Sequence, residues 1–315
     1  MPDAGPKKRT EWDVADHEDG FWRSYSTDED KARINSHYDR PAEFFTTLTG
    51  GEWNVYSCNL WESAQTDTES QERKLDLLAA MLDLRPGERV LDVGCGWGGP
   101  LVYLAKRYGV SGVGITPSPR QAEYANHRAS AYGVPVAFHV KHWREMNEAG
   151  SFDAVYSDEV IVHFSDLGGF FEKARDLLRP GGRMLNKELH FASSRFMQVT
   201  RGMVFINKLA GETGHYRMLH DELSLLDRAG FDIVRIEQMA LPNYQRTLDD
   251  WLANIRESQH RLEALVGPDD VRHFRTYLKV SRKSHGGPSM TLDLVLARNP
   301  ASAGGLRAAR YEASR

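Results

Sequence analysis

The segment VLDVGCGWGG, residues 90–99, constrains the fold more than any other part of the sequence. A short apolar run ends at Val93, and four of the next six residues are glycines. These are Gly94, Gly96, Gly98 and Gly99. Glycines at such a turn let the backbone pass beneath a ligand that a Cβ would strike. The segment therefore predicts a buried strand that turns into a helix beneath a flat or anionic ligand.

Helical and strand periodicities alternate around this loop. Helices are expected at 68–84, 100–108, 118–133 and 166–178, and strands at 110–115, 134–140, 152–157 and 182–191. A further helix and strand are expected at 221–230 and 231–240, then helices at 244–266 and 268–285. The last strand, 289–298, is expected at the sheet edge. Such alternation predicts a parallel, doubly wound α/β sheet.

Composition excludes several classes of function. The net charge of -4 and the pI near 6.3 provide no basic field for nucleic acid or an anionic membrane. The two cysteines, Cys58 and Cys95, lie in no CxxC or Cys/His spacing, so neither a disulfide framework nor a metal site is expected. No uncharged apolar run approaches the roughly 18 residues of a membrane span. A cytoplasmic location is expected, and the sequence leaves the oligomeric state open.

The residues around the glycine loop distinguish between two cofactors. A nicotinamide cofactor requires an acidic residue about 20 residues further on, and GVGITPSPRQ, residues 112–121, has none. An acid, Asp92, instead precedes the glycines. The resulting pattern LDxGCGxG resembles that of S-adenosylmethionine (SAM)-dependent methyltransferases, in which the loop underlies the amino-acid end of the cofactor. SAM is therefore the expected ligand.

Several further motifs occur in order along the chain. They are HYDRPAEFF, VYSCNLWES, QERKLDLL, GVGITPSPRQ and YQRTLDDW. With them the chain resembles, from Ile34 to Arg298, the cyclopropane-fatty-acid and mycolic-acid cyclopropane synthases and their relatives that methylate alkenes. The resemblance implies a seven-stranded sheet of the class I SAM-dependent methyltransferase type, with N-terminal helices and an insertion after the fifth strand covering the site.

The domain expectations combine this resemblance with composition. Residues 1–20 and 299–315 are polar or rich in small residues and are expected to be mobile tails. Residues 21–298 are expected to form the methyltransferase domain. Within it, residues 192–217 form the expected cover, whose Met and Phe residues either bind the acceptor or pack in the core.

The resemblance also implies cofactor-binding residues. Tyr56 and Ser57 would lie over SAM and Gly94 and Gly96 under it. Thr116 and Gln121 would lie near the ribose and adenine, and Trp143 would stack near the adenine. The Gln121 amide can both donate to and accept from ribose hydroxyls, which would replace the missing acid.

In these synthases an alkene attacks the SAM methyl group, and a bound bicarbonate then takes a proton from the cation. A Cys, a Glu, a His and a Tyr hold the bicarbonate. Here Cys58 and Tyr244 match, whereas Val162 and Asn186 occupy the Glu and His positions. Bicarbonate is therefore not expected to bind in the usual way. Cys58 has a second interpretation, as a small buried residue.

The segment VYSDEVIVHF, residues 155–164, contains a possible replacement for the cage. Glu159 resembles a glutamate that terpenoid and sterol C-methyltransferases place facing their carbocation, and it is expected to stabilise the cation and take its proton. Asp158 is expected to cap the next helix or face solvent. His163 either lines the pocket or has its hydrogen bonds satisfied within the fold. Glu188 lies either at the core edge or in the active site.

Three functions follow. The first is SAM-dependent C-methylation or cyclopropane formation on an alkene or other electron-rich carbon of a small metabolite or lipid. The alternative is N- or O-methylation of a small specialised metabolite. The third is a SAM-binding protein that has lost catalysis, against which the intact glycine loop argues.

Overall fold

The computed structural model of the chain describes residues 25–38, 40–196 and 214–301. The expectations for residues 1–20, for most of the cover at 192–217 and for most of the tail at 299–315 lie outside these ranges. Asn299, the first residue of that tail, is buried, and its amide donates to the backbone carbonyls of Arg175, Leu178 and Arg179.

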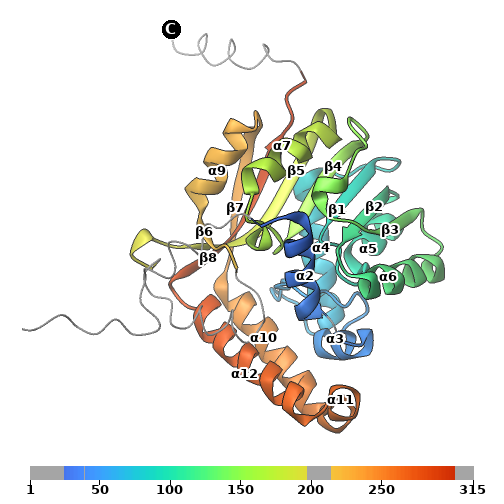
Figure 1. The fold of residues 1–315 in the computed structure, drawn as a ribbon, viewed down its shortest axis with the longest axis vertical. Coiled ribbons are helices and arrows are strands. Elements are labelled where there is room, and N and C mark those ends of the chain that lie inside the picture. Colours follow the sequence, from blue (N-terminus) through green and yellow to red (C-terminus); the bar gives the residue numbers. More distant parts are fainter. Residues whose placement is uncertain (1–24, 39, 197–213, 302–315) are drawn as a thin grey trace, which may run out of the picture.

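The centre of the molecule is a twisted sheet (Figure 1). Its strands are β1 (Arg89–Val93), β2 (Ser111–Thr116), β3 (Val136–Val140), β4 (Phe152–Asp158), β5 (Leu178–Phe191), β6 (Arg217–Met218), β7 (Asp232–Met239) and β8 (Met290–Arg298). The order is β3-β2-β1-β4-β5-β8-β7, and the short β6 pairs with β5. Strands β1 to β5 pair in parallel, whereas β8 is antiparallel to β5 and β7. The doubly wound sheet is confirmed.

The position of β8 differs from the expectation. The strand does not lie at the edge but between β5 and β7, and β7 is the edge strand. Most of β8 is buried, whereas Val234 and Ile236 on β7 are exposed. A strand covered on both faces reads as a nearly continuous apolar run, which is the pattern of LDLVLA. The apolar run is thus the sequence signal for the interior position.

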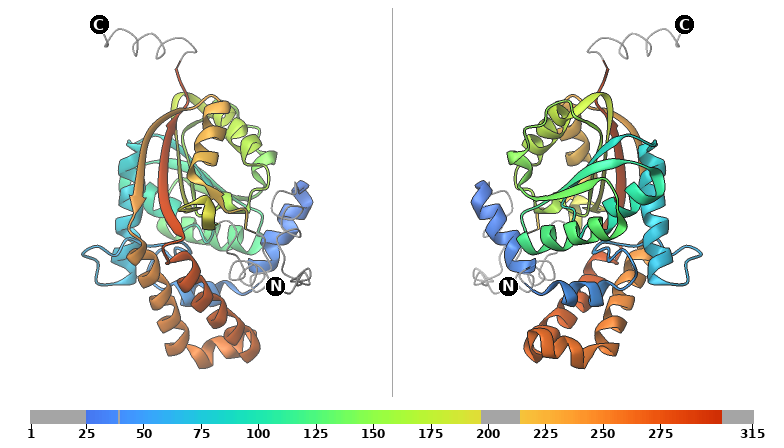
Figure 2. Two further views of the ribbon diagram at one scale, coloured as in Figure 1. Left: turned by 90° about the vertical axis from the view of Figure 1, so that its left-hand side faces the viewer. Right: turned by 90° about the vertical axis from the view of Figure 1, so that its right-hand side faces the viewer.

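Helices cover both faces of the sheet (Figure 2). Helices α4 (Asp67–Leu82), α5 (Gly99–Tyr108) and α6 (Pro119–Tyr132) contribute to one apolar core, and α7 (Leu167–Leu177) and α9 (Leu219–Arg228) to another. The neighbouring strand residues Val90 and Leu91 belong to different cores. Because successive strand residues point to opposite faces, the two cores lie on opposite sides of the sheet.

A helical lobe adjoins the end of the sheet where the parallel strands terminate (Figure 1). It contains α10 (Leu241–Glu257), α11 (Gln259–Val266) and α12 (Pro268–His285), packed with α3 (Ala42–Thr49) around a third core. The helix expected over 244–266 is therefore two helices. In the open α/β class, ligands bind outside the carboxyl ends of the strands, which is where this lobe lies.

Within the described residues, the remaining elements are α2 (Thr27–Tyr38) and three short 3₁₀ helices, η1 (Trp143–Glu145), η2 (Ile161–His163) and η3 (Ser194–Phe196). Among the described residues, no helix is both long and apolar enough to cross a bilayer.

Candidate active site

The glycine loop after β1 has the backbone conformation that the sequence predicts. Gly94 and Gly96 have φ values of 79° and 50°, a left-handed region that favours glycine. A Cβ on Gly94 would lie 2.5 Å from the Val160 side chain. A Cβ on Gly96 would meet no atom within 4 Å, and Gly96 lines two cavities. Gly94 is thus needed for packing, and Gly96 leaves room for a ligand.

One of these two cavities, here called cavity A, encloses about 530 Å³. Gly96, Thr116, Gln121 and Trp143 line it, as the expectation of an adenosine site requires. Thr116 Oγ1 donates a 2.6 Å hydrogen bond to Gln121 Oε1, which orients the amide. The Trp143 indole is buried. Cavity A therefore combines an aromatic wall with an amide suited to ribose hydroxyls.

The other, cavity B, encloses about 510 Å³ and is lined by Tyr56, Ser57, Asp92 and Gly94. Asp92 is 2% exposed, and burial raises the pKa of its carboxyl to about 7. An ammonium group beside Asp92 would favour its ionised form. Cavities A and B share Gly94, Gly96, Gln121 and Glu159, and the chemistry of their lining residues fits SAM. The adenosyl group fits cavity A, and the charged amino-acid end fits cavity B.

Cavity C encloses about 730 Å³ between the sheet and the helical lobe. Aromatic and apolar residues line much of it, among them Tyr38, Tyr56, Val162, Leu189, Tyr216, Tyr244, Leu248, Trp251, Tyr277 and Leu278. The Tyr56 ring stacks on Trp251 with the ring centres 4.9 Å apart. Cavity C thus offers a largely aromatic and apolar surface next to Glu159.

Glu159 lines all three cavities. Its φ of 57° is in the left-handed region, which is unusual for a residue other than glycine and is concentrated at functional sites. Glu159 N–H donates to the Lys187 carbonyl at 2.7 Å, and Cys58 N–H donates to Glu159 Oε1 at 2.8 Å. The Lys187 ammonium also contacts Oε1. These bonds hold the carboxylate where the cavities meet.

Asp158 neither caps a helix nor faces solvent, so that expectation is wrong. Asp166 caps α7, whereas Asp158 is in contact with two buried ammonium groups, those of Lys74 and Lys187. Ser57 Oγ donates to it at 2.7 Å. Burial raises the pKa of Asp158, but the two lysines outweigh this and hold it below its usual range. Asp158 is therefore a buried counter-ion.

Sequence reasoning did not single out Lys74 and Lys187, although both side chains are completely buried. Lys187 lies on β5, between Asn186 and Glu188, and Lys74 lies on α4. Three consecutive polar residues on an interior strand, Asn186, Lys187 and Glu188, are the signal that could have identified Lys187. Lysine is almost never fully buried without a partner, so each required a carboxylate nearby.

Of the four positions that correspond to the bicarbonate cage of the synthases, only two line cavity C. Tyr244 and Val162 line cavity C. Cys58 is buried, and burial raises the pKa of its thiol to about 12. Asn186 contacts Ser157 and Glu222, so it lies away from Glu159, and the cation next in sequence, Lys187, is the residue that contacts Glu159.

Two other expected site residues, Glu188 and His163, also lie at cavity C. Glu188 Oε2 accepts a 3.0 Å hydrogen bond from Val162 N–H. Burial, aided by the nearby Glu159, raises the pKa of Glu188 to about 8. Glu188 is therefore largely protonated at neutral pH. His163 lines both cavity A and cavity C.

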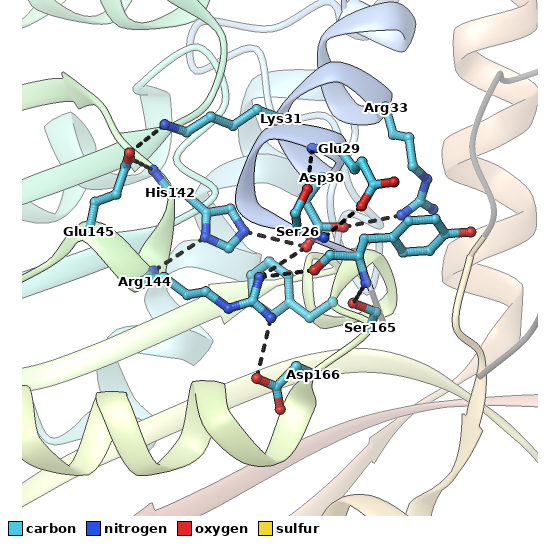
Figure 3. A network of polar contacts seen from close by, with 12 residues as sticks. Ser26, Glu29, Asp30, Lys31, Arg33, His142, Arg144, Glu145, Ser165 and Asp166 are labelled. Atoms are coloured by element: carbon cyan, nitrogen blue, oxygen red, sulfur yellow. Dashed lines mark hydrogen bonds and ion pairs between the residues drawn. The ribbon is translucent and has the colours of Figure 1, made fainter. Parts of the chain in front are cut away.

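The N-terminal helix α2 closes one side of cavity A, through Ile34 and Tyr38. Figure 3 shows the polar network that holds this helix. Asp30 Oδ2 lies 3.6 Å from His142 Nε2 and 3.5 Å from Arg144, and Lys31 pairs with Glu145. These partners flank Trp143. The network joins α2 to the wall that would contact adenine, and sequence reasoning did not identify it.

Comparisons with known proteins agree with this geometry. Residues 25–292 match the family described as mycolic acid cyclopropane synthetase. A probable fatty acid methyltransferase of Pseudomonas putida is 30% identical over 265 residues, covering 81% of this chain and 66% of that protein. The S-adenosylmethionine-dependent methyltransferase UmaA of Mycobacterium tuberculosis is 30% identical over 262 residues, covering 76% of this chain and 88% of that protein.

Solved structures show the same fold. The cyclopropane synthase MmaA2 from M. tuberculosis has a TM-score of 0.79 at 24% identity, covering 85% of this chain and 98% of that chain. The mycolic acid cyclopropane synthase CmaA1, complexed with SAH and CTAB, gives the same values. The chain spans slightly less than two thirds of the P. putida relative and of a second relative, the probable fatty acid methyltransferase Rv3720 of M. tuberculosis.

The fold is that of the class I SAM-dependent methyltransferases, as expected. The expected family is confirmed over most of the chain. This protein belongs to the mycolic acid cyclopropane synthetase family of SAM-dependent methyltransferases.

Proposed function

We propose that this protein transfers the methyl group of SAM to an alkene or another electron-rich carbon of a small metabolite or lipid. The observation that carries the proposal is that Glu159 lines cavities A, B and C together. A carboxylate at such a junction lies between the cofactor and the acceptor. Some relatives that the chain resembles have names that refer to fatty acids and mycolic acids, which supports a lipid as one acceptor class.

The residues that line cavities A and B would act by holding SAM in a fixed position. When bound, SAM supplies an electrophilic methyl group on a positively charged sulfur. Asp92 would pair with its ammonium group, Gln121 with its ribose, and Trp143 would pack near its adenine. Holding the reactants about 3 to 3.5 Å apart can remove much of the barrier to methyl transfer.

Glu159 would stabilise the positive charge that develops on the acceptor and then take a proton from it. Both of its side-chain hydrogen bonds use Oε1, so within the described residues Oε2 is the oxygen left for the acceptor. A fixed carboxylate in a site with little water acts more strongly than one in solution. Loss of the proton would give either an alkene or a cyclopropane ring.

Cavity C would protect the cation from water. Tyr38, Tyr56, Tyr244 and Trp251 form an aromatic wall, and aromatic faces attract cations. Bicarbonate has no necessary role in this scheme, because Glu159 supplies the base. N- or O-methylation, the alternative, would need a base or mere positioning but no aromatic wall to shield a carbocation.

The proposal is tested by incubating the purified full chain with SAM and a panel of unsaturated lipids and small alkenes. A product heavier by one CH2 demonstrates transfer, and proton NMR distinguishes an upfield cyclopropane from a methyl group on carbon. Methylation only at nitrogen or oxygen would support the alternative. Failure to consume SAM with any acceptor in the panel would contradict the proposal.

A further inference from the structure

One face of α12 places two polar side chains at cavity C. Ser281 and His285 are four residues apart, so they lie on consecutive turns of the same helix face. They are 2% and 3% exposed, and both line cavity C. Within the described residues, neither Ser281 Oγ nor His285 Nδ1 has a hydrogen-bond partner.

Such atoms are unusual because buried polar groups are nearly always hydrogen-bonded. Leaving one unpaired is unfavourable unless a ligand or water supplies the missing bond. Two unpaired atoms, carried by residues that line one cavity from one helix face, are best explained by an occupant of that cavity that pairs with them.

The imidazole of His285 is fixed in place. Its Nε2 lies 3.0 Å from the Tyr216 hydroxyl, and its ring packs against Tyr216 and, edge-on, against Tyr244. Burial lowers the pKa of His285 to about 4, so the ring is neutral at physiological pH. Its Nδ1 is therefore either a neutral donor or a neutral acceptor, depending on the tautomer.

We propose that Ser281 and His285 form a subsite that binds a hydroxyl group of the acceptor. A hydroxyl both donates and accepts, so it can pair with Ser281 Oγ and with His285 Nδ1 in either tautomer. The acceptor is then an oxygenated alkene, with its hydroxyl toward α12 and its double bond toward Glu159. This inference rests on the proposed function in treating cavity C as the acceptor site.

The test uses cis-alkenols, from octenol to octadecenol, with the hydroxyl at stepwise distances from the double bond. Each is paired with the alkene that lacks the hydroxyl and with the saturated alcohol of the same length. Binding is measured by calorimetry on the protein saturated with S-adenosylhomocysteine, where no transfer occurs. Methyl transfer from SAM is measured separately as kcat/KM.

At least one alkenol should bind, and react, tenfold or more better than its matched alkene, because the alkene leaves both polar atoms unpaired. His285→Phe and Ser281→Ala should each reduce the ratio of alkenol to alkene binding, and of the corresponding kcat/KM values, toward one. SAM affinity should stay the same. His285→Gln, which keeps a hydrogen-bonding group, should retain part of it. Ser284→Ala is the matched control, because Ser284 Oγ bonds to the Val280 carbonyl and does not line cavity C.

If His285→Phe fails to fold because Tyr216 loses its partner, Tyr216→Phe/His285→Phe removes both polar groups together. A direct readout is the His285 ring-nitrogen NMR shift, which should move on adding a saturated alcohol but not the matched alkane. Equal binding of alkenols and alkenes by the wild type would overturn the subsite, since water would then be the partner. Alcohol binding that depends on His285, without methyl transfer, would preserve the subsite and contradict the proposed function.

Discussion

The ammonium group of Lys187 contacts the carboxylate of Glu159 where cavities A, B and C meet. Lys187 also pairs with Asp158 at 2.8 Å, and Asp158 pairs with Lys74. Burial lowers the pKa of Lys187, but Asp158 and Glu159 outweigh this and raise it, so Lys187 stays charged. The carboxylate proposed to act on the acceptor is therefore held by a fixed buried cation.

Glu159→Gln keeps the shape of the side chain and removes its charge. Turnover should fall by about 10²-fold or more, since the carboxylate no longer stabilises developing positive charge or accepts a proton. SAM affinity should be nearly unchanged. Steady-state kinetics and calorimetry measure the two effects, and Glu172→Gln, at an exposed position on α7, is the control. Near-normal turnover would refute the assigned role and make Glu188 the next candidate.

Asp158→Asn should destabilise the fold rather than change the chemistry directly. It leaves the buried Lys74 without its carboxylate, and breaking a buried ion pair in this way costs about 3 kcal/mol. Urea denaturation followed by circular dichroism measures the loss. Asp83→Asn breaks an exposed pair with Arg85 and should produce no measurable change. Equal stability of the two variants would show that the buried network contributes little.

Gly96→Ala should weaken SAM binding because the added Cβ enters open space at a residue that lines both cavity A and cavity B. We expect a loss of about tenfold in affinity, or about 1.4 kcal/mol. Gly181→Ala is a matched control, since Gly181 also has a positive φ and open space but lines none of the three cavities. Calorimetry should show the loss only for Gly96→Ala; unchanged affinity would count against the cofactor assignment.

Removal of bicarbonate should have little effect on turnover. Val162 cannot hold the anion, Asn186 is hydrogen-bonded to Ser157 and Glu222, and Lys187 is engaged by two carboxylates. The measurement compares initial rates in degassed buffer with rates after bicarbonate is added back. A large, reversible stimulation would mean that the remaining groups, such as Tyr244, hold the ion, and that Glu159 is not the sole base.

Glu188 should make stability fall as the pH rises. Its folded-state pKa is about 8, above the usual 4.5, so the folded protein keeps a proton that the unfolded chain releases. The stabilisation of the folded state by protonated Glu188 is complete below about pH 4.5 and is lost as the pH rises to about 8. Glu188→Gln cannot ionise, so it should become more stable relative to the wild type across this interval. Denaturation curves at several pH values test this, and a difference independent of pH would contradict it.

The sequence alone determined the features that depend on local backbone geometry and on motif. Gly94 and Gly96 have positive φ values that glycine adopts without strain, so the cofactor loop could be identified before the structure was known. The alternation of helices and strands predicted the doubly wound sheet, because its periodicities are set by burial of one face of each element. The position of Glu159 after β4 likewise followed from its place in the chain.

Only the tertiary structure decided which groups meet. Asp158 is 84 residues from Lys74 and 29 from Lys187, so its role as a buried counter-ion could not be deduced from its neighbours in sequence. The strand β8 lies in the interior of the sheet rather than at the expected edge, because it pairs with β5 on one side and with β7 on the other. The pairing of His285 with Tyr216, 69 residues apart, exists only because α12 folds back over the sheet end. Burial and charge pairing depend on such long-range contacts, which the local sequence does not specify.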